Sequence, residues 1–227
     1  MKRVITVLLA VLLVLSLAAC GSRVETKKLA GTWTCTIDVT DRMNAAAEQA
    51  LGLSAADGTA QMPLQLVLTV TEDGAYTLRY DSDAVRTALD AYAAALHPAA
   101  VESVYAAAEE QGLSREEYDA AMEKAGITMD DMVAAIFAGV DEEELLSLLT
   151  GRSAAITGYC RAESGQLYLA DTAAELAETA DCLSYTLSDG TMTWTDAQGE
   201  LSSQLTEQEQ ELLRVPLTWT KRAEESK

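Results

Sequence analysis

The stretch KLAGTWTCTIDVT, from Lys28 to Thr40, decides how the rest of the chain is interpreted. From Trp33 to Val39 every second side chain is apolar, and the residues between them are threonines and an aspartate. A period of two is typical of a β-strand with one buried and one exposed face. The stretch therefore predicts a strand over residues 32–39, and the next question is what kind of sheet that strand belongs to.

Further segments with the same alternation follow, most of them joined by short turns. Asp73-Gly74 and Asp189-Gly190 are typical of tight hairpins, and a third hairpin is expected to turn at Glu163-Ser164 and to pair Cys160 with Leu167. The predicted strands span residues 32–39, 64–71, 75–80, 155–162, 165–170, 182–187, 191–195 and 216–221.

Between the third and fourth strands the pattern changes to that of helices. Residues 82–150 are rich in alanine with apolar residues at helical spacing, and we expect four or five short helices there, one of them ending at His97-Pro98. Ser114–Glu117 and Thr128–Asp131 have the spacing of capping boxes, which mark helix starts. A separate helix is expected over residues 41–55.

Eight strands joined by hairpins can close into an up-and-down barrel. Gly31-Thr32-Trp33 resembles the Gly-X-Trp motif of lipocalins and the wider calycin group. This resemblance implies that Trp33 closes one end of the barrel beneath a basic side chain of the last strand, where Lys221 and Arg222 stand. We predict an α+β fold: a lipocalin-like antiparallel up-and-down β-barrel of about eight strands with a helical insertion between strands 3 and 4.

The whole mature chain also resembles a lipocalin-like group of small lipoproteins from gut Firmicutes, a group without an assigned activity. The matching stretches are Gly31–Asp38, Gly74–Tyr76 and Gly165–Asp171. They are strand and turn motifs, so the resemblance implies a shape and not a reaction. The helical insertion of roughly 70 residues departs from true lipocalins, because it is far longer than an ordinary loop.

The first residues, MKRVITVLLAVLLVLSLAACGS, read as a secretion signal. Lys2 and Arg3 precede an uncharged apolar run that ends in small residues, and Leu17–Cys20 resembles the lipobox of bacterial lipoproteins. By that resemblance the chain is cut before Cys20, whose thiol receives a diacylglyceryl group. Two acyl chains suffice for stable anchoring, so we expect a protein held on the extracytoplasmic face of the cell membrane. The alternative is an ordinary secretory signal with a chance cysteine.

These observations divide the chain into four parts. Residues 1–19 are the signal peptide, and residues 20–28 are the lipidated cysteine and a tether. Residues 29–81 together with 151–222 form the barrel, and residues 82–150 form the helical insertion.

The chain is strongly acidic. Its net charge of −20 becomes −22 once the two basic residues of the signal peptide are removed. So negative a protein repels phosphate backbones and anionic lipid surfaces, which argues against nucleic acid as a partner. An acidic surface that keeps an exported protein soluble accounts for this composition. A cationic or cell-envelope partner is permitted by the charge.

After Cys20 the chain has three cysteines: Cys35, Cys160 and Cys182. Three is an odd number, and none has the paired spacing of metal ligands. Cys35 is expected to be a buried apolar side chain. A bridge between Cys160 and Cys182 is left open, because both lie near the ends of predicted strands.

No motif in the chain carries a recognisable reaction. The single histidine, His97, is expected at a helix end beside Pro98, and no serine has the surroundings of a nucleophile. Asp81–Asp83 reads as a helix cap and not as a calcium loop, because the required glycine and glutamate are missing. The acidic run Asp141–Glu144 is expected at a helix N-terminus. We expect no enzyme, cofactor or metal.

The preferred hypothesis is a binding module whose barrel holds a small apolar or amphipathic molecule. The aromatic and methionine side chains of the strands are its candidate lining. These residues are Tyr76, Tyr80, Tyr159, Tyr168 and Met192.

The alternative hypothesis is a scaffold of the cell envelope that binds a protein through its helical insertion. It predicts that the apolar residues of one insertion helix form an exposed patch. These residues are Met129, Met132, Ile136 and Phe137.

Overall fold

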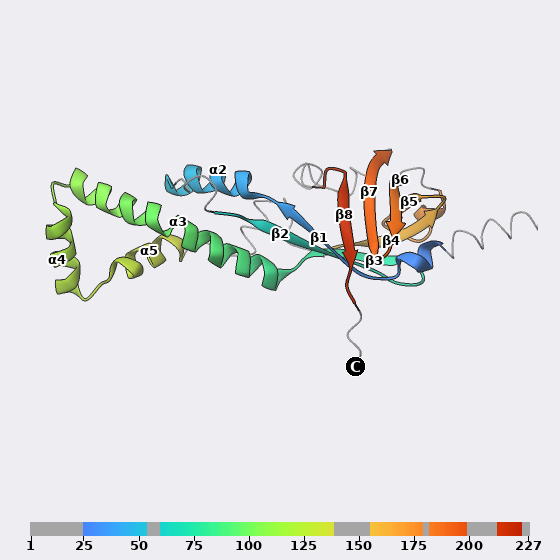
Figure 1. The fold of residues 1–227 in the computed structure, drawn as a ribbon, viewed down its shortest axis with the longest axis horizontal. Coiled ribbons are helices and arrows are strands. Elements are labelled where there is room, and N and C mark those ends of the chain that lie inside the picture. Colours follow the sequence, from blue (N-terminus) through green and yellow to red (C-terminus); the bar gives the residue numbers. More distant parts are fainter. Residues whose placement is uncertain (1–24, 54–59, 139–154, 179–181, 199–212, 224–227) are drawn as a thin grey trace, which may run out of the picture. The chain divides into compact units, whose positions relative to one another are not determined.

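The computed structural model describes residues 25–53, 60–138, 155–178, 182–198 and 213–223. Its strands form a closed antiparallel barrel in which each strand neighbours the next in the chain (Figure 1). The strands are β1 (Gly31–Asp38), β2 (Pro63–Val70), β3 (Ala75–Tyr80), β4 (Ile156–Glu163), β5 (Gln166–Ala170), β6 (Cys182–Ser188), β7 (Thr191–Gln198) and β8 (Leu217–Lys221).

The opening strand closes the barrel. β1 pairs antiparallel with β8, where Trp33 lies opposite Lys221 and Thr34 opposite Thr220. Closure pairs the first strand with the last, whose edges would otherwise be open to strand-to-strand association. The predicted fold class is therefore confirmed: an α+β chain with an eight-stranded antiparallel barrel and a helical insertion between β3 and β4. Each predicted strand overlaps an observed one, and β7 runs on to Gln198.

Two of the hairpins turn through two residues that both have positive φ. The angles are 47° and 77° at Asp189-Gly190, and 54° and 76° at Ser164-Gly165. Positive φ at both central positions defines the type I′ turn, which matches the twist of the strands that it joins. The predicted turn at Asp189-Gly190 is confirmed.

The hairpin between β4 and β5 turns one residue later than predicted. Glycine best tolerates the second positive φ, so the turn is centred on Ser164-Gly165 and not on Glu163-Ser164. A shift of one residue in the turn moves the strand pairing by two. Cys160 therefore pairs with Leu169, and the predicted pairing with Leu167 is wrong.

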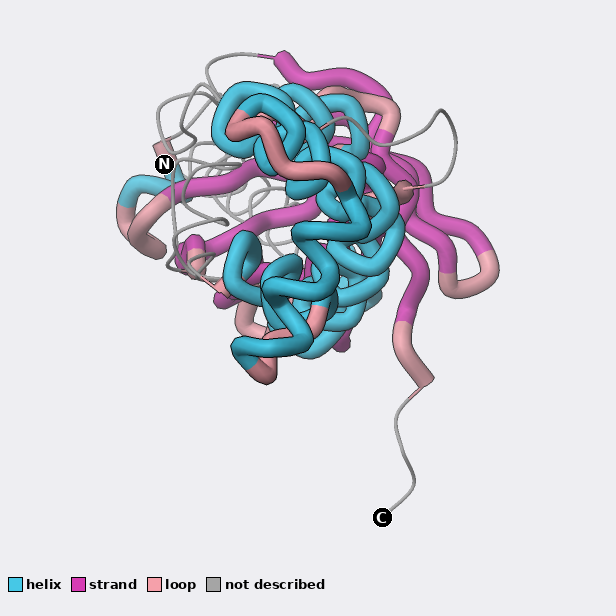
Figure 2. The backbone as a smooth tube through the Cα atoms, turned by 90° about the vertical axis from the view of Figure 1, so that its left-hand side faces the viewer, coloured by secondary structure: helices cyan, strands magenta, loops and turns pink. Residues whose placement is uncertain are grey.

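The insertion consists of α3 (Ser82–Glu110), α4 (Arg115–Ala125) and α5 (Met129–Phe137) in the described part of the chain. Short loops join these helices in the tube view of Figure 2. The predicted helix end at His97-Pro98 is wrong, because α3 continues through Pro98 for a total of 29 residues. Residues 139–150 lie outside the described residues. None of the helices in the described part has the length and apolarity needed to cross a bilayer.

The reason that α3 continues is the burial of its other face. Tyr92, Leu96 and Ala100 are buried at successive steps of four residues, so they form one stripe along the helix. Pro98 and Ala94 are exposed. The Ala94 carbonyl, which the proline cannot bond, thus lies on the solvent side of the helix. Packing along the buried stripe outweighs one hydrogen bond lost on the exposed side.

The helix starts that were predicted from capping patterns are confirmed. The Ser114 and Glu117 side chains each accept a hydrogen bond from the other residue's backbone N–H, and Thr128 and Asp131 do the same. Asp81 caps α3 by accepting from the backbone N–H of Ala84 at 3.3 Å.

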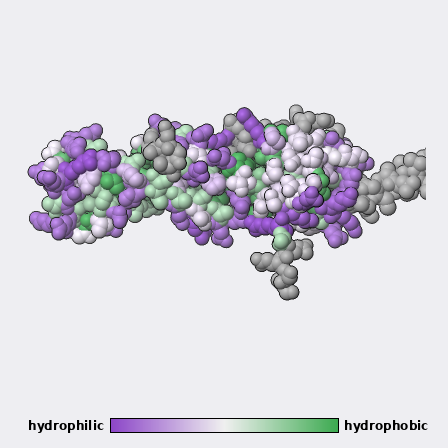
Figure 3. Space-filling view, in the orientation of Figure 1, coloured by the Kyte–Doolittle hydropathy of each residue, from purple (hydrophilic) through white to green (hydrophobic). Residues whose placement is uncertain are grey.

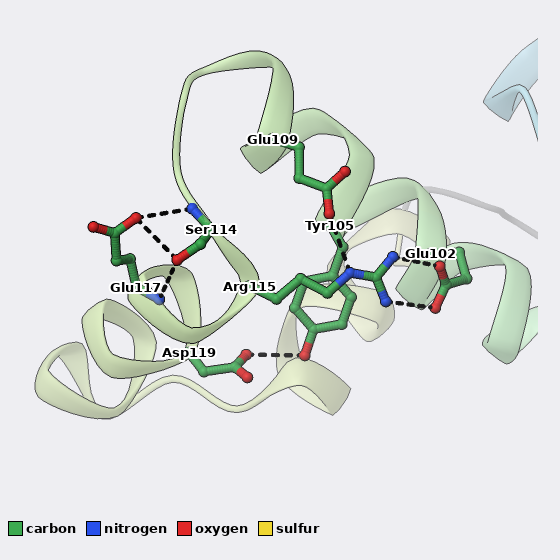
Figure 4. Close-up of polar contacts among 7 residues, drawn as sticks. All are labelled: Glu102, Tyr105, Glu109, Ser114, Arg115, Glu117 and Asp119. Atoms are coloured by element: carbon green, nitrogen blue, oxygen red, sulfur yellow. Dashed lines mark hydrogen bonds and ion pairs between the residues drawn. The ribbon is translucent and has the colours of Figure 1, made fainter.

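The turn from α3 to α4 is held by Arg115 (Figure 4). Its guanidinium binds both carboxylate oxygens of Glu102, at 3.1 and 2.8 Å, and its Nε binds Glu109 at 3.2 Å. The same guanidinium lies 4.7 Å from the centre of the Tyr105 ring, whose hydroxyl donates to Asp119. The surface around α4 is largely hydrophilic in Figure 3. This agrees with a helix–helix turn that is exposed to solvent and has a structural role.

The chain divides into two compact units. Of the described residues, the barrel unit contains 25–35, 66–80, 155–178, 182–198 and 213–223, and the helical unit contains 36–53, 60–65 and 81–138. Besides the insertion, the helical unit includes α2 (Thr40–Leu51), where the Tyr92 hydroxyl donates to Asn44 at 2.8 Å. A short 3₁₀ turn, η1 (Glu175–Ala177), belongs to the barrel unit.

The helical unit has an apolar cluster of its own, formed by Leu53, Ala100 and Val133. The apolar residues of α5 pack against this cluster and are only partly exposed. They are Met129, Ile136 and Phe137. For these three of the four predicted residues, the expectation of an exposed patch is therefore wrong, because their side chains pack against the core of the unit.

Candidate binding cavity

A cavity of about 80 Å³ lies inside the barrel unit. Because side chains alternate along a strand, every second residue of β2 to β7 can face inward, and most of the inward residues here are leucine, isoleucine, valine or methionine. Among the described residues that line the cavity, none is charged. The interior is thus an apolar space and not a site for ions.

The Gly-Thr-Trp motif lies at the start of β1, the first strand of the barrel. Trp33 is 1% exposed, and the Lys221 ammonium lies 5.3 Å from the centre of its ring. A cation at this distance interacts favourably with an indole face. Arg222, the other predicted basic residue, is exposed, and its backbone N–H donates to the Thr32 carbonyl at 2.8 Å.

Gly31 makes this arrangement sterically feasible. Its φ is +129°, and a Cβ at this position would lie 2.6 Å from the Cε of Lys221. Such a distance is a clash, so any larger residue would displace the lysine stem from the Trp33 ring.

The residues just before the motif are part of the barrel unit. Residues 25–29 form a helical turn, and its Leu29 lines the cavity. The Leu29 carbonyl accepts a hydrogen bond from the Trp33 indole at 2.7 Å. Thr26 is buried and its hydroxyl accepts from the Ala162 backbone N–H at 3.0 Å. The Thr26 contact connects the end of the predicted tether to strand β4 of the barrel.

Two of the five candidate lining residues line the cavity. Tyr76 and Met192 contact it, whereas Tyr80, Tyr159 and Tyr168 are half-buried and do not line it.

The strand alternation explains this division. Cys160 lines the cavity, so its neighbour Tyr159 faces the other side of the sheet. Leu167 and Leu169 also line it, and Tyr168 between them instead lies against Arg161, whose guanidinium is 4.4 Å from its ring centre.

Sequence reasoning omitted Trp194 from the candidate lining. Trp194 contacts the cavity two residues after Met192 on β7. The spacing of two was the available signal, because it places both side chains on one face of the strand.

The ring of Trp194 also packs against Trp219 of β8. The two ring centres are 4.8 Å apart and the planes are tilted by 47°. Trp194 is 6% exposed and Trp219 is fully buried. Within the described residues, neither indole Nε1 has a hydrogen-bond partner. Two donors in this apolar core are thus unsatisfied.

Cys160 is the thiol in the cavity wall. Burial raises its pKa to about 12, so the group is neutral at physiological pH. Cys160 and Cys182 are not bridged, because their strands β4 and β6 are separated by β5. A separation of two strand spacings exceeds the reach of a disulfide. Cys182 instead lies 3.2 Å from the Gln166 side-chain oxygen.

No protein-family model matches this chain, and no curated protein or solved structure matches it either. The closed eight-stranded antiparallel barrel is consistent with a lipocalin-like fold. The argument about function therefore rests on the cavity and on the residues around it.

His97, which was considered earlier for catalysis, is not among the residues that line the cavity. His97 is in the middle of α3 and not at a helix end, and its Nε2 lies 3.1 Å from Asp130 on α5. This pair joins two helices of the helical unit. Cys20 and the acidic run Asp141–Glu144 lie outside the described residues.

Proposed function

We propose that this protein is an extracytoplasmic lipoprotein, anchored to the cell membrane through Cys20, whose lipocalin-like barrel binds a small apolar molecule without catalysis. The observation that carries the proposal is the uncharged cavity inside the barrel. Apolar pockets with few polar groups are typical of small-molecule binding sites.

The size of the cavity favours a small ligand over a long amphipathic one. At about 80 Å³ it is smaller than the apolar cavity of roughly 150 Å³ that accepts benzene in another protein. Pockets for drug-sized ligands begin at about 300 Å³. A ligand of a few non-hydrogen atoms fits the space as it stands.

The alternative of a protein scaffold loses its main support in the helical unit. Three of the four residues expected to form an exposed patch, Met129, Ile136 and Phe137, pack against the unit's own apolar cluster. We therefore keep the binding module as the proposed function.

The binding proposal is tested by mass spectrometry of molecules that copurify with residues 21–227, which retain all of the described residues. Val70→Phe fills the cavity, whereas Thr69→Phe places the same ring on the exposed face of the same strand. We expect a small apolar compound with the wild type and with Thr69→Phe, and none with Val70→Phe. Equal retention by both variants would contradict binding in the cavity.

The anchor is tested by metabolic labelling of the full chain with a palmitate analogue in bacteria. We expect label and membrane association in the wild type and in Cys182→Ala, and neither in Cys20→Ala. Labelled Cys20→Ala protein would contradict the anchor without bearing on the cavity.

A further inference from the structure

Two indole N–H groups of the barrel core have no partner among the described residues, and one of them belongs to Trp194, which lines the cavity. Buried tryptophans normally donate their N–H to an acceptor. Here Trp194 lines the cavity and is only 6% exposed. Its Nε1 has no hydrogen-bond partner among the described residues. Each such group in a folded protein calls for an explanation.

An internal water is a poor explanation for this donor. A buried water is held by two to four polar partners. Apart from Trp194, the described side chains around the cavity offer only the Tyr76 hydroxyl, the Cys160 thiol and the Met192 thioether, which is a weak acceptor. Tyr76 already has an interaction of its own, and a thiol bonds weakly. Water in this space would lose more hydrogen bonds than it makes.

A ligand with an apolar body and one acceptor atom matches the lining better. Its apolar body would fill the cavity and pack against the leucines. Its acceptor atom would accept a hydrogen bond from the indole N–H. A charged acceptor such as a carboxylate is disfavoured, because no positive side chain is among the described lining residues.

We infer that the ligand of this cavity is a small neutral molecule with one hydrogen-bond acceptor, such as a ketone or ether oxygen, which accepts from the indole N–H of Trp194. This inference rests on the proposed function, since it assigns the chemical class of ligand for the same cavity. Trp219 is the supporting ring: it packs against Trp194 in a tilted arrangement and is not among the residues that line the cavity.

The test compares two probes of the same shape, butanone and 2-methyl-1-butene, which differ by an oxygen in place of a methylene group. NMR spectra of residues 21–227 report binding through the methyl signals of the lining leucines and valines, and hydrogen bonding through the tryptophan indole protons. We expect both probes to shift methyl signals, and only butanone to move one indole proton downfield. That signal should be the one missing from Trp194→Phe.

A pair of variants gives the quantitative result. In Trp194→Phe, we expect the affinity for butanone relative to 2-methyl-1-butene to fall about fivefold, the worth of one ordinary hydrogen bond. Trp219→Phe is the matched control, because it removes an equally buried N–H from a ring outside the cavity wall, and its affinity ratio should equal that of the wild type. Circular dichroism checks that both variants remain folded.

The outcomes separate this inference from the proposed function. If both probes bind and no indole proton responds, or if both variants give the same affinity ratio, the acceptor is not recognised by Trp194 and the inference is overturned while the binding function stands. If neither probe shifts the methyl signals, the cavity does not take molecules of this size, and the proposed function fails together with the inference.

Discussion

At the scale of single residues, Lys221 approaches Gly31 closely at the point where the barrel closes. The lysine stem occupies the space where a side chain of residue 31 would project, and its ammonium lies over the Trp33 ring. The glycine, the lysine and the tryptophan therefore act together. A change at one of them has consequences that depend on the others.

Gly31→Ala should destabilise the protein by about 1–3 kcal/mol, because it adds backbone strain at positive φ to the clash with Lys221. Urea unfolding followed by tryptophan fluorescence measures the loss. In a Lys221→Ala background the same glycine substitution should cost less, since only the backbone strain remains. Additive effects of the two substitutions would contradict the steric account.

At the scale of elements, the capping boxes decide where α4 and α5 begin. Ser114→Ala removes the side-chain acceptor of α4 and should cost about 1 kcal/mol of local stability. Hydrogen exchange of the α4 amides measures this effect. Ser103→Ala is the matched control, because Ser103 is exposed in the middle of α3 and should leave exchange unchanged. Equal exchange in the two variants would count against the cap.

The same cap predicts a pH dependence for α4. Hydrogen bonds from the Ser114 backbone and hydroxyl lower the pKa of Glu117 from its ordinary value of 4.5. The folded carboxyl thus binds protons less readily than the unfolded one. Its contribution to stability is present above pH 4.5 and is lost as the pH falls through the lower folded pKa.

NMR titration of the carboxyl groups measures this shift. We expect Ser114→Ala to return the pKa of Glu117 toward its ordinary value. Hydrogen bonds from Thr128 lower the pKa of Asp131, and that pKa should stay low in the same variant. A Glu117 titration that is unchanged in Ser114→Ala would contradict the assignment.

Pro98 is the point at which α3 is least favourable locally. Pro98→Ala restores a backbone N–H to an exposed position of a helix that is already continuous. We expect the unfolding free energy to rise by about 1–3 kcal/mol, within the helix penalty of proline. Pro98→Gly should gain less, because glycine also disfavours helix. A loss of stability in Pro98→Ala would show that the proline relieves some other strain.

At the scale of the whole molecule, no disulfide links any of the cysteines in the described part of the chain. Cys35, Cys160 and Cys182 are all free and buried, and burial raises the pKa of Cys35 to about 11. Neutral, inaccessible thiols react slowly.

A thiol reagent applied to residues 21–227 should therefore label little of the native protein and all three cysteines in denaturant. Labelling of only one cysteine in denaturant, without prior reduction, would show a disulfide and contradict the structure.

The sequence already contained most of the barrel. The alternation from Trp33 to Val39 and the turn at Asp189-Gly190 predicted strands and pairing, because strand periodicity and positive φ are local properties. The prediction for the turn at Ser164-Gly165 was wrong by one residue, because Ser164 suits either central position of the turn. The register of β4 and β5 also depends on the strands that they pair with.

What the sequence determined by itself was the type and order of the elements: eight strands, a helical insertion and the capped helix starts. The tertiary structure decided what depends on distant contacts. The burial of Tyr92, Leu96 and Ala100 stabilises α3 enough for the helix to continue past Pro98, although a proline by itself favours a helix end. Closure of β1 on β8 brings Lys221 over Trp33, and the inward faces of the strands leave a small apolar cavity beside Trp194. The size of that space is set by how side chains from different strands pack, and no single segment encodes it.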